Sequence, residues 1–295
     1  MRGLLDLLRA PKGDVLGINR RNVSFVQARN ARRDFPLADD KLLAKEVLSA
    51  AGVPVSPTLA TFRHFYEIRE FAQRIEGLSE FVLKPAQGSG GNGIVVIAGR
   101  EGDRFRTAGG RSLTFDELHR HVHDIVYGVY ALDHSDVAIV EPRLRPSPFF
   151  ADLFASGLSD VRIVAVDDVA VMAMLRVPTR ASDGRANLHQ GALGLAVEID
   201  SGTVTRAWSR GAVIDRHPDT GGPLTGLVVP QWPRILDIGR AVANAVPLKY
   251  LGIDIVVDRT LGPLVLEINA RPGLEIQNVN GVPLRRRLRE RGVAE

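Results

Sequence analysis

Two short apolar segments near the end of the chain constrain its fold and chemistry most strongly. Residues 264–269 read Leu-Val-Leu-Glu-Ile-Asn, which is typical of a buried strand with Glu267 and Asn269 on one face. The preceding strand-like segment, 253–257, places Asp254 among apolar neighbours, where an unpaired carboxylate would be costly. Carboxylate and amide oxygens are the ligands that Mg²⁺ prefers. We therefore predict a magnesium site on two adjacent strands.

Composition limits the classes of protein that fit this chain. Its 295 residues are 45% hydrophobic and 24% charged, which suits a globular protein large enough for two or three lobes. No apolar run reaches the roughly 18 residues of a membrane span. The first residues lack a signal-peptide pattern, so we expect a cytoplasmic location. The absence of cysteine excludes disulfides and thiolate metal ligands.

The net charge of +4 raises the question of nucleic-acid binding. Single-strand binders normally combine basic residues with stacking aromatics. Only 6% of the residues are aromatic, and none is interleaved with the arginine clusters. We therefore predict a solvated basic surface, or one that attracts an acidic substrate, and no nucleic-acid partner.

The pattern of apolar residues predicts strands alternating with a few helices. Thr114 and Glu117 have the spacing of a capping box that opens one of the helices. We expect helices at 39–51, 63–76, 114–130, 232–246 and 283–292. We expect strands at 24–26, 81–83, 94–97, 137–141, 161–167, 169–176, 195–199, 253–258 and 264–269.

A glycine-rich loop lies between two of the predicted strands. Lys84 precedes it, and Gly88, Gly90 and Gly93 fit the pattern G-x-G-x-x-G. Glycines allow backbone N–H groups to cradle phosphate oxygens. Because a strand follows the loop, it is not the strand-to-helix turn of a dinucleotide-binding fold. A phosphate-binding flap and a hairpin without a ligand are the two interpretations that the residues leave open.

The order of these features resembles the ATP-grasp superfamily. More narrowly, the chain resembles the RimK-type branch, the group called alpha-L-glutamate ligase-like proteins. The matching segments are 40–43, 81–97, 139–141, 160–162, 187–191, 252–254 and 263–275. Of these, the strings Asn-Leu-His-x-Gly and Glu-Ile-Asn-x-x-Pro-Gly-Leu-Glu are the specific ones. Similar strings to those in 199–232 occur in ATP-grasp proteins associated with sugar or polysaccharide transfer.

The resemblance implies an α+β ATP-grasp fold, in which two α+β lobes sandwich ATP. It implies a first lobe over 39–140, with the glycine flap, and a second lobe over 141–295, with the metal site. Residues 1–38 would be a short N-terminal segment that is reduced relative to RimK-type ligases. Residues 199–232 would be an insertion in the second lobe.

The resemblance also implies roles for individual residues. Arg162, Arg176 and Arg271 would be catalytic, and Arg271 would also orient the substrate carboxylate together with His189 and Gln190. Asp254, Glu267 and Asn269 would hold two Mg²⁺ ions, with Mn²⁺ as the alternative. The nucleotide would be bound by Lys41, Lys84, Gly88, Ser89, Gly90, Gly91, Gly93, Glu141, Asp160 and Asn187.

For three of these roles the residues also allow an interpretation in which the side chain has no function in the reaction. Lys41 is also consistent with a solvated helix lysine, and Arg162 and Arg176 with structural ion pairs. His189 is equally consistent with positioning an acceptor and with bracing its loop.

The implied reaction is ATP- and Mg²⁺-dependent carboxylate–amine ligation through an acylphosphate. It would add glutamate, or a similar amino acid, to a peptide, protein or small-molecule acceptor. The alternatives are a phosphotransferase of the same fold and a non-catalytic nucleotide-binding module that works with a partner protein. Homo-oligomerisation stays open.

Overall fold

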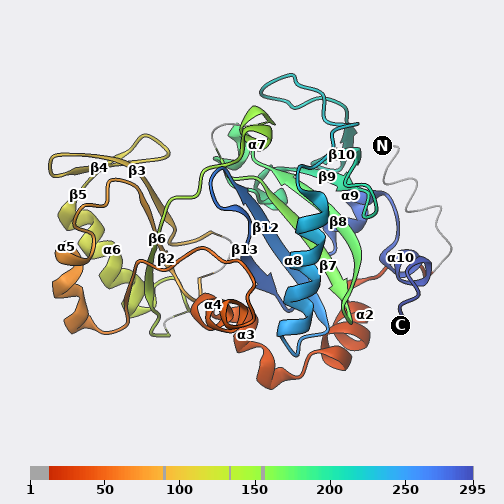
Figure 1. Cartoon of the computed structure of the whole chain (residues 1–295), viewed down its shortest axis with the longest axis horizontal. Coiled ribbons are helices and arrows are strands. Elements are labelled where there is room, and N and C mark those ends of the chain that lie inside the picture. The colour runs from red at the N-terminus through yellow and green to blue at the C-terminus, as the bar shows by residue number, and fades with distance from the viewer. Residues whose placement is uncertain (1–12, 89–90, 133, 154–156, 295) are drawn as a thin grey trace. The chain divides into compact units, whose positions relative to one another are not determined.

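The computed structural model describes residues 13–88, 91–132, 134–153 and 157–294. The chain divides into two compact units (Figure 1). The seven-stranded unit holds the described residues up to Asp39, Leu43–Val55, and those from Arg145 onward. The six-stranded unit holds Asp40–Leu42 and Ser56–Leu144.

The seven-stranded unit is built on one antiparallel sheet with the strand order β11-β10-β9-β8-β7-β12-β13. Its strands are β7 (Asp160–Val166), β8 (Val169–Val177), β9 (Leu193–Val197), β10 (Val204–Ser209), β11 (Ala212–Ile214), β12 (Tyr250–Asp258) and β13 (Gly262–Asn269). Its helices are α2 (Ile18–Arg20), η1 (Arg21–Gln27), η2 (Arg32–Asp34), α3 (Pro36–Asp39), α7 (Pro148–Leu153), η4 (Arg180–Ser182), η5 (Leu188–Gln190), α8 (Trp232–Ala245), α9 (Glu275–Asn280) and α10 (Leu284–Glu290). Helix α4 (Lys41–Ala50) belongs to this unit from Leu43 onward.

The six-stranded unit has an antiparallel sheet with the strand order β1-β6-β2-β3-β4-β5. Its strands are β1 (Ala60–Phe62), β2 (Phe81–Pro85), β3 (Val95–Glu101), β4 (Arg104–Thr107), β5 (Ser112–Thr114) and β6 (Ala138–Glu141). Its helices are η3 (Phe65–Glu70), α5 (Phe71–Arg74) and α6 (Phe115–Tyr127).

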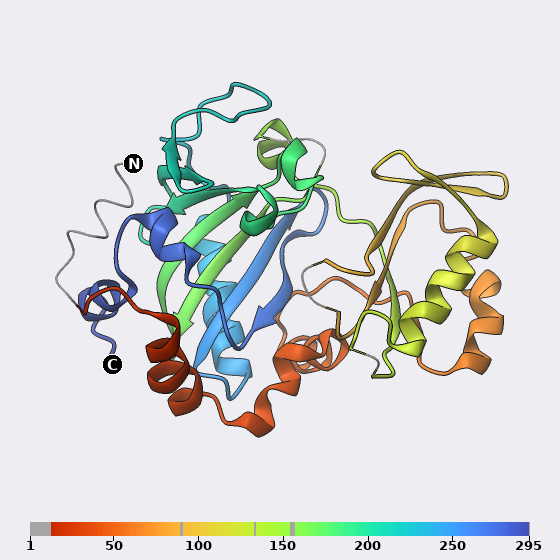
Figure 2. The same cartoon turned by 180° about the vertical axis from the view of Figure 1, so that it is seen from behind.

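The two faces of the seven-stranded sheet are buried by different elements. Side chains alternate between faces along a strand, so Val161 and Ile163 of β7 point to one face and Val164 and Val166 to the other. Helix α8 covers the first face (Figure 1). The second face is covered by η1, α9 and α10, which lie in front of the sheet in the reverse view (Figure 2). Charged side chains occupy the part of this second face that bears the candidate site.

Helices α5 and α6 cover one side of the six-stranded sheet. Phe81 and Leu83 of β2 and Val140 of β6 face α5 and α6 in a continuous apolar cluster. The neighbouring residues Lys84 and Glu141 therefore point to the opposite face. This alternation places two charged residues side by side on a surface free of α5 and α6.

Two buried amides fasten the N-terminal segment to the seven-stranded unit. The Asn30 Nδ2 group donates to the carbonyls of Tyr250 and Ala270, and Asn30 Oδ1 accepts from the N–H groups of Lys249 and Tyr250. The Gln277 side chain exchanges hydrogen bonds with both backbone groups of Leu16. The segment up to Asp39 therefore packs as part of this unit, although the sequence suggested a separate segment over 1–38.

Most of the predicted elements are found, and one is wrong. The predicted strand at 24–26 lies inside the helical segment η1. Arg21, Phe25, Val26 and Asn30 are buried there, and this spacing of four to five residues is helical. The predicted helix at 63–76 is a 3₁₀ segment, η3, followed by the short helix α5. Elements β1, β4, β5, β10, β11, α7 and α9 were not predicted from the sequence.

The division into units differs in detail from the predicted lobes. Residues 43–55 fall within the predicted first lobe, but Ala44, Leu48 and Val53 join the core beside α8 in the seven-stranded unit. The predicted insertion at 199–232 forms strands β10 and β11, which extend that sheet beyond β9. No helix in the described part of the chain is long and apolar enough to cross a membrane.

Candidate functional site

A row of charged side chains crosses three neighbouring strands of the seven-stranded sheet. Asp254 of β12 lies opposite Glu267 of β13 on one side and opposite Arg162 of β7 on the other. Directly opposed residues in an antiparallel pair share a face and lie within contact distance. The sheet register thus brings Arg162 next to Asp254, although the two residues are 92 positions apart in the chain.

Two arginines neutralise the buried carboxylate of Asp254. Arg162 forms a bidentate pair with it, in which Nε donates to Oδ1 and Nη2 donates to Oδ2, the second bond being 2.6 Å long. Arg176 Nη2 also donates to Oδ2, at 2.7 Å, while its Nε donates to Asp160 Oδ1 at 2.6 Å. Both arginines therefore form the ion pairs that the sequence left as an alternative.

Burial and charge act in opposite directions on the two aspartates. Burial would raise the pKa of Asp254, but Arg162 and Arg176 outweigh it and hold that pKa well below its usual range. Burial and the nearby charge of Asp254 outweigh Arg176 at the other carboxyl, and they raise the pKa of Asp160 to about 7. Burial would lower the pKa of Arg176, but Asp160 and Asp254 raise it, so the guanidinium stays charged.

Glu267 and Asn269 are the most accessible oxygen donors of this row. Both are partly exposed, and Asn269 Nδ2 lies 3.3 Å from Glu267 Oε1, as their spacing on β13 predicts. Gly252 lies opposite Asn269, and a Cβ at this position would come within 2.8 Å of Pro272. A carboxylate and a carboxamide that are neighbours on one strand face offer the kind of oxygen ligands that a hard divalent cation takes.

Asp254 fits the same cation less directly. Both of its oxygens already accept hydrogen bonds from guanidinium groups. Among the described residues, no group of three or more His, Cys, Asp or Glu side chains could hold a metal ion. The donor set therefore suits a cation that keeps phosphate and water among its ligands, rather than one enclosed by protein.

The loop after β8 holds the predicted residues Asn187, His189 and Gln190. Asn187 Oδ1 accepts from the His189 N–H at 3.0 Å and so caps η5. His189 is exposed, whereas Gln190 Oε1 is buried and has no hydrogen-bond partner in the described residues. His217 Nε2 lies 3.2 Å from the carbonyl of Pro178, so the 199–232 region braces the start of this loop.

In the six-stranded unit, Lys84 and Glu141 form a buried ion pair. The Lys84 Nζ and Glu141 Oε1 atoms are 2.8 Å apart, and each side chain is about 5% exposed or less. Lys84 is in register with Ile139, so the pair is diagonal across β2 and β6. These are two of the residues that the sequence assigned to nucleotide binding.

The glycine loop is anchored where it leaves β2. Lys41 Nζ donates to the carbonyls of Ala86 and Gly88, at 3.2 and 2.5 Å. The Gln87 N–H donates to both carboxylate oxygens of Asp136 at 3.1 Å. Lys41 is therefore held against the loop and is not a solvated helix lysine.

Other loop residues are placed by backbone requirements. Gly91 and Gly93 have φ angles of +81° and +74°, which favour glycine. The Gly93 carbonyl lies 2.9 Å from Nε2 of His121 on α6. The predicted residues Ser89 and Gly90 lie outside the described residues.

Arg271 lies two residues beyond Asn269, past the end of β13. Its guanidinium stands 4.3 Å from the centre of the Phe35 ring. Sequence reasoning missed Phe35 and the loop anchor Asp136. The carboxylate of Asp136 is buried directly before β6, and a polar residue at the entrance to an apolar strand was the available signal.

A family model described as "Sugar-transfer associated ATP-grasp" matches residues 20–292. The chain belongs to this ATP-grasp family. The resemblance predicted from the sequence is thereby confirmed at the level of the superfamily. Membership implies the use of ATP and a divalent metal.

Curated relatives bear a more specific name. A "Probable alpha-L-glutamate ligase" of Mannheimia succiniciproducens is 24% identical over 255 residues, which are 86% of this chain and 62% of the relative. Another protein of that name, from Legionella pneumophila, is 24% identical over 238 residues, covering 80% of this chain and 56% of the relative. The chain thus spans about three fifths of the length of these relatives.

A solved structure supports the fold. The complex of biotin carboxylase from Campylobacter jejuni with β,γ-ATP aligns with a TM-score of 0.51 and 19% identity. The alignment covers 88% of this chain and 47% of that one. The α+β ATP-grasp fold predicted from the sequence is confirmed.

Proposed function

We propose that this protein is an ATP- and Mg²⁺-dependent carboxylate–amine ligase. The observation that supports this best is the row formed by Arg162, Asp254 and Glu267, which places cations and a metal-binding carboxylate on one sheet face. The name of the curated relatives, probable alpha-L-glutamate ligase, supports glutamate or a similar amino acid as one substrate.

Glu267 and Asn269 would hold Mg²⁺, with Mn²⁺ as the alternative, because their side chains are neighbours on one face of β13 and are partly exposed. When bound, the cation would neutralise charge on the ATP phosphates. Asp254 would also bind the cation if Arg162 and Arg176 released its carboxylate and donated their hydrogen bonds to phosphate oxygens instead. Two ions would fit a set of three such ligands.

The residues that the sequence assigned to the nucleotide include some from each unit. In the six-stranded unit, Lys84 would contact phosphate while Glu141 meets the nucleoside part. Lys41 would orient the glycine loop, whose N–H groups from Gly88 to Gly93 would cradle phosphate oxygens. In the seven-stranded unit, Asp160 and Asn187 would complete the contacts.

The chemistry would proceed in two displacements. A substrate carboxylate oxygen attacks the γ-phosphorus, ADP leaves, and an acylphosphate forms. An amine nitrogen then attacks the acyl carbon, inorganic phosphate leaves, and an amide bond forms with loss of a proton. Arg162 and Arg176 would offset charge on the transferring phosphoryl group, and Arg271 would orient the carboxylate. His189 and Gln190 would position the acceptor.

The direct test is ADP release from ATP and Mg²⁺ in the presence of single amino acids and pairs of them. Because the family is described as sugar-transfer associated, amino sugars belong among the acceptors tested. We expect release that requires glutamate or a similar amino acid, with a product mass that equals both substrates minus water. A stable phosphorylated product would instead establish a phosphotransferase. ATP binding without ADP release for every acceptor would support a non-catalytic module.

A further inference from the structure

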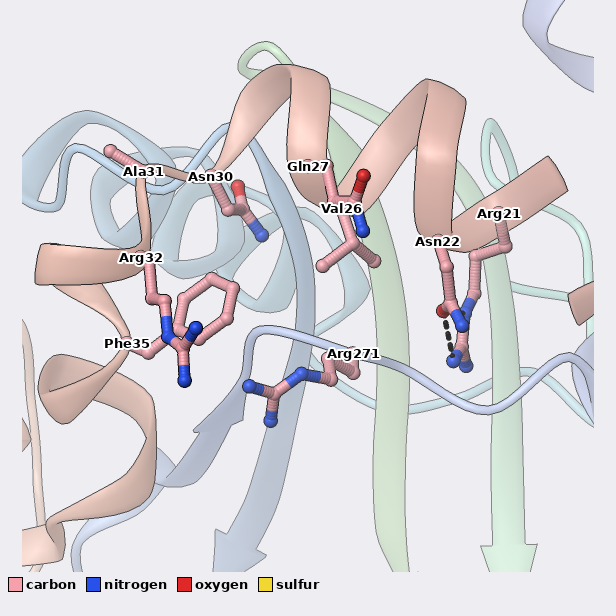
Figure 3. Close-up of a pocket in the computed structure, with 9 residues that line it drawn as sticks. All are labelled: Arg21, Asn22, Val26, Gln27, Asn30, Ala31, Arg32, Phe35 and Arg271. Carbon is pink, nitrogen blue, oxygen red and sulfur yellow. Dashed lines mark hydrogen bonds between the residues drawn. The ribbon is translucent and has the colours of Figure 1, made fainter. Parts of the chain in front are cut away.

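A cavity of about 440 Å³ lies beside Arg271 in the seven-stranded unit. The N-terminal segment supplies most of its wall, including Arg21, Gln27, Arg32 and Phe35 (Figure 3). Its volume falls in the range of sites for small molecules. The proposed ligase chemistry assigns no role to any of these four residues.

The cavity is strongly cationic. Three arginines line it, and no aspartate or glutamate does. Figure 3 shows Arg271 entering from the loop after β13, with Arg32 and Phe35 on one side and Arg21 on the other. Within the described part of the chain, none of the three arginines forms an ion pair with a carboxylate.

Of the three arginines, Arg21 gives the strongest indication of an anion site, because its side chain is buried. Only 9% of the residue is exposed. Its Nε and Nη2 atoms donate to Asn22 Oδ1, at 3.1 and 2.7 Å, and its Nη1 donates to the Pro272 carbonyl at 3.1 Å. All three hydrogen bonds go to neutral acceptors, so the charge itself is uncompensated. A buried cation of this kind favours an anion nearby.

The wall is held in place before any ligand arrives. The Asn30 side chain makes four hydrogen bonds to the backbone of Lys249, Tyr250 and Ala270. These bonds fix the chain just after η1 against the sheet. The Phe35 ring supports the Arg271 guanidinium at 4.3 Å. A site that needs little reorganisation loses little of its binding energy to ordering.

We propose that this cavity binds a small dicarboxylic acid, as the anionic substrate of the ligase. The proposal rests on the proposed function. One carboxylate would lie between Arg21 and Arg271, and Arg32 would meet the second. Val26 and Phe35 offer apolar surface to a carbon chain, and the exposed Gln27 offers an amide. These features favour an organic dianion over a compact inorganic phosphate.

The test is calorimetric titration of the full chain with glutarate, propionate and inorganic phosphate, without ATP or metal. We expect saturable binding of glutarate and much weaker binding of propionate and phosphate. Arg32→Gln should weaken glutarate binding about tenfold, because a charge-assisted contact is lost. Arg32 is exposed, so this variant should fold normally.

Arg33→Gln is the matched control. Arg33 is adjacent in sequence, its side chain is 87% exposed, and it does not line the cavity. It should bind glutarate as the unmodified chain does. Equal weakening by both variants, absence of glutarate binding, or equally tight binding of phosphate would each overturn the assignment. Because no nucleotide is present, this titration is independent of turnover. Glutarate binding by a chain that releases no ADP with any amino acid or acceptor would count against the ligase and leave the binding of a dicarboxylic acid in the cavity standing.

Discussion

At the scale of single residues, the candidate site depends on charges that are buried in pairs. Lys84 and Glu141 are almost inaccessible and lie 2.8 Å apart. Removing one member of such a pair leaves the other buried without compensation, which costs far more than the pair contributes. The same reasoning applies to Asp254, whose two carboxylate oxygens accept hydrogen bonds from two guanidinium groups.

Lys84→Met should therefore destabilise the six-stranded unit by about 3 kcal/mol. The double variant Lys84→Met/Glu141→Leu should recover most of this loss, since it removes both charges. Urea denaturation of the two variants and of the unmodified chain measures both values. A double variant no more stable than Lys84→Met would mean that lost packing, and not the stranded carboxylate, accounts for the effect.

Several residues of the charged row could be predicted from the sequence. A polar residue within an apolar strand shows which strand face carries the site, and a buried charge there requires a partner. Glu267, Asn269 and Asp254 were identified in this way. Their partners Arg162 and Arg176 came from the resemblance, and the register that pairs them is a tertiary property. The cavity residues Arg21 and Arg32 could not be predicted, because an arginine outside an apolar strand gives no such signal.

At the scale of elements, a local capping signal predicted where one helix begins. Thr114 Oγ1 accepts from the Glu117 N–H at 3.2 Å, and Glu117 Oε2 accepts from the Thr114 N–H at 2.7 Å. This capping box begins α6 where the sequence placed it, and Gly128, with a φ angle of +99°, ends the helix. The strand predicted at 24–26 was wrong because a stretch of three residues is too short to show the helical spacing of the buried residues Arg21, Phe25 and Asn30.

Thr114→Ala should lower the free energy of unfolding of the six-stranded unit by about 1 kcal/mol, as expected for loss of an N-cap. Thr114→Ser keeps the hydroxyl and should lose only a small part of that amount. Thermal or urea unfolding, followed by circular dichroism, compares the two. If the alanine variant matched the serine variant in stability, the hydroxyl would not be what stabilises the start of α6.

At the scale of the whole molecule, residues 13–39 are an integral part of the seven-stranded unit. From the sequence we expected only a short N-terminal segment over 1–38, because no motif in it signals long-range contacts. The buried amides of Asn30 and Gln277 make those contacts, over more than 200 positions in the chain. A single amide side chain produces no recognisable sequence pattern, so the packing of this segment against the sheet could not be predicted.

Asn30→Ala should destabilise the seven-stranded unit by about 2–4 kcal/mol, because it strands buried backbone groups of Lys249, Tyr250 and Ala270. Asn19→Ala, at an exposed position of the same segment, is the control and should change stability little. Equal denaturation midpoints for the two variants would show that the segment contributes little to the fold.

The central claim is that the Glu267 carboxylate supports formation of an acylphosphate. Hydroxylamine can replace an unknown amine acceptor, because it captures an acylphosphate as a hydroxamate and releases phosphate. The measurement is hydroxamate and ADP formed from ATP, Mg²⁺, hydroxylamine and glutamate. Glu290→Gln, which alters a surface ion pair on α10, is the control for Glu267→Gln. The account predicts equal amounts of hydroxamate and ADP for the unmodified chain and for Glu290→Gln, and a loss of at least about 100-fold for Glu267→Gln. Hydroxamate formation by Glu267→Gln at the rate of the unmodified chain would contradict it.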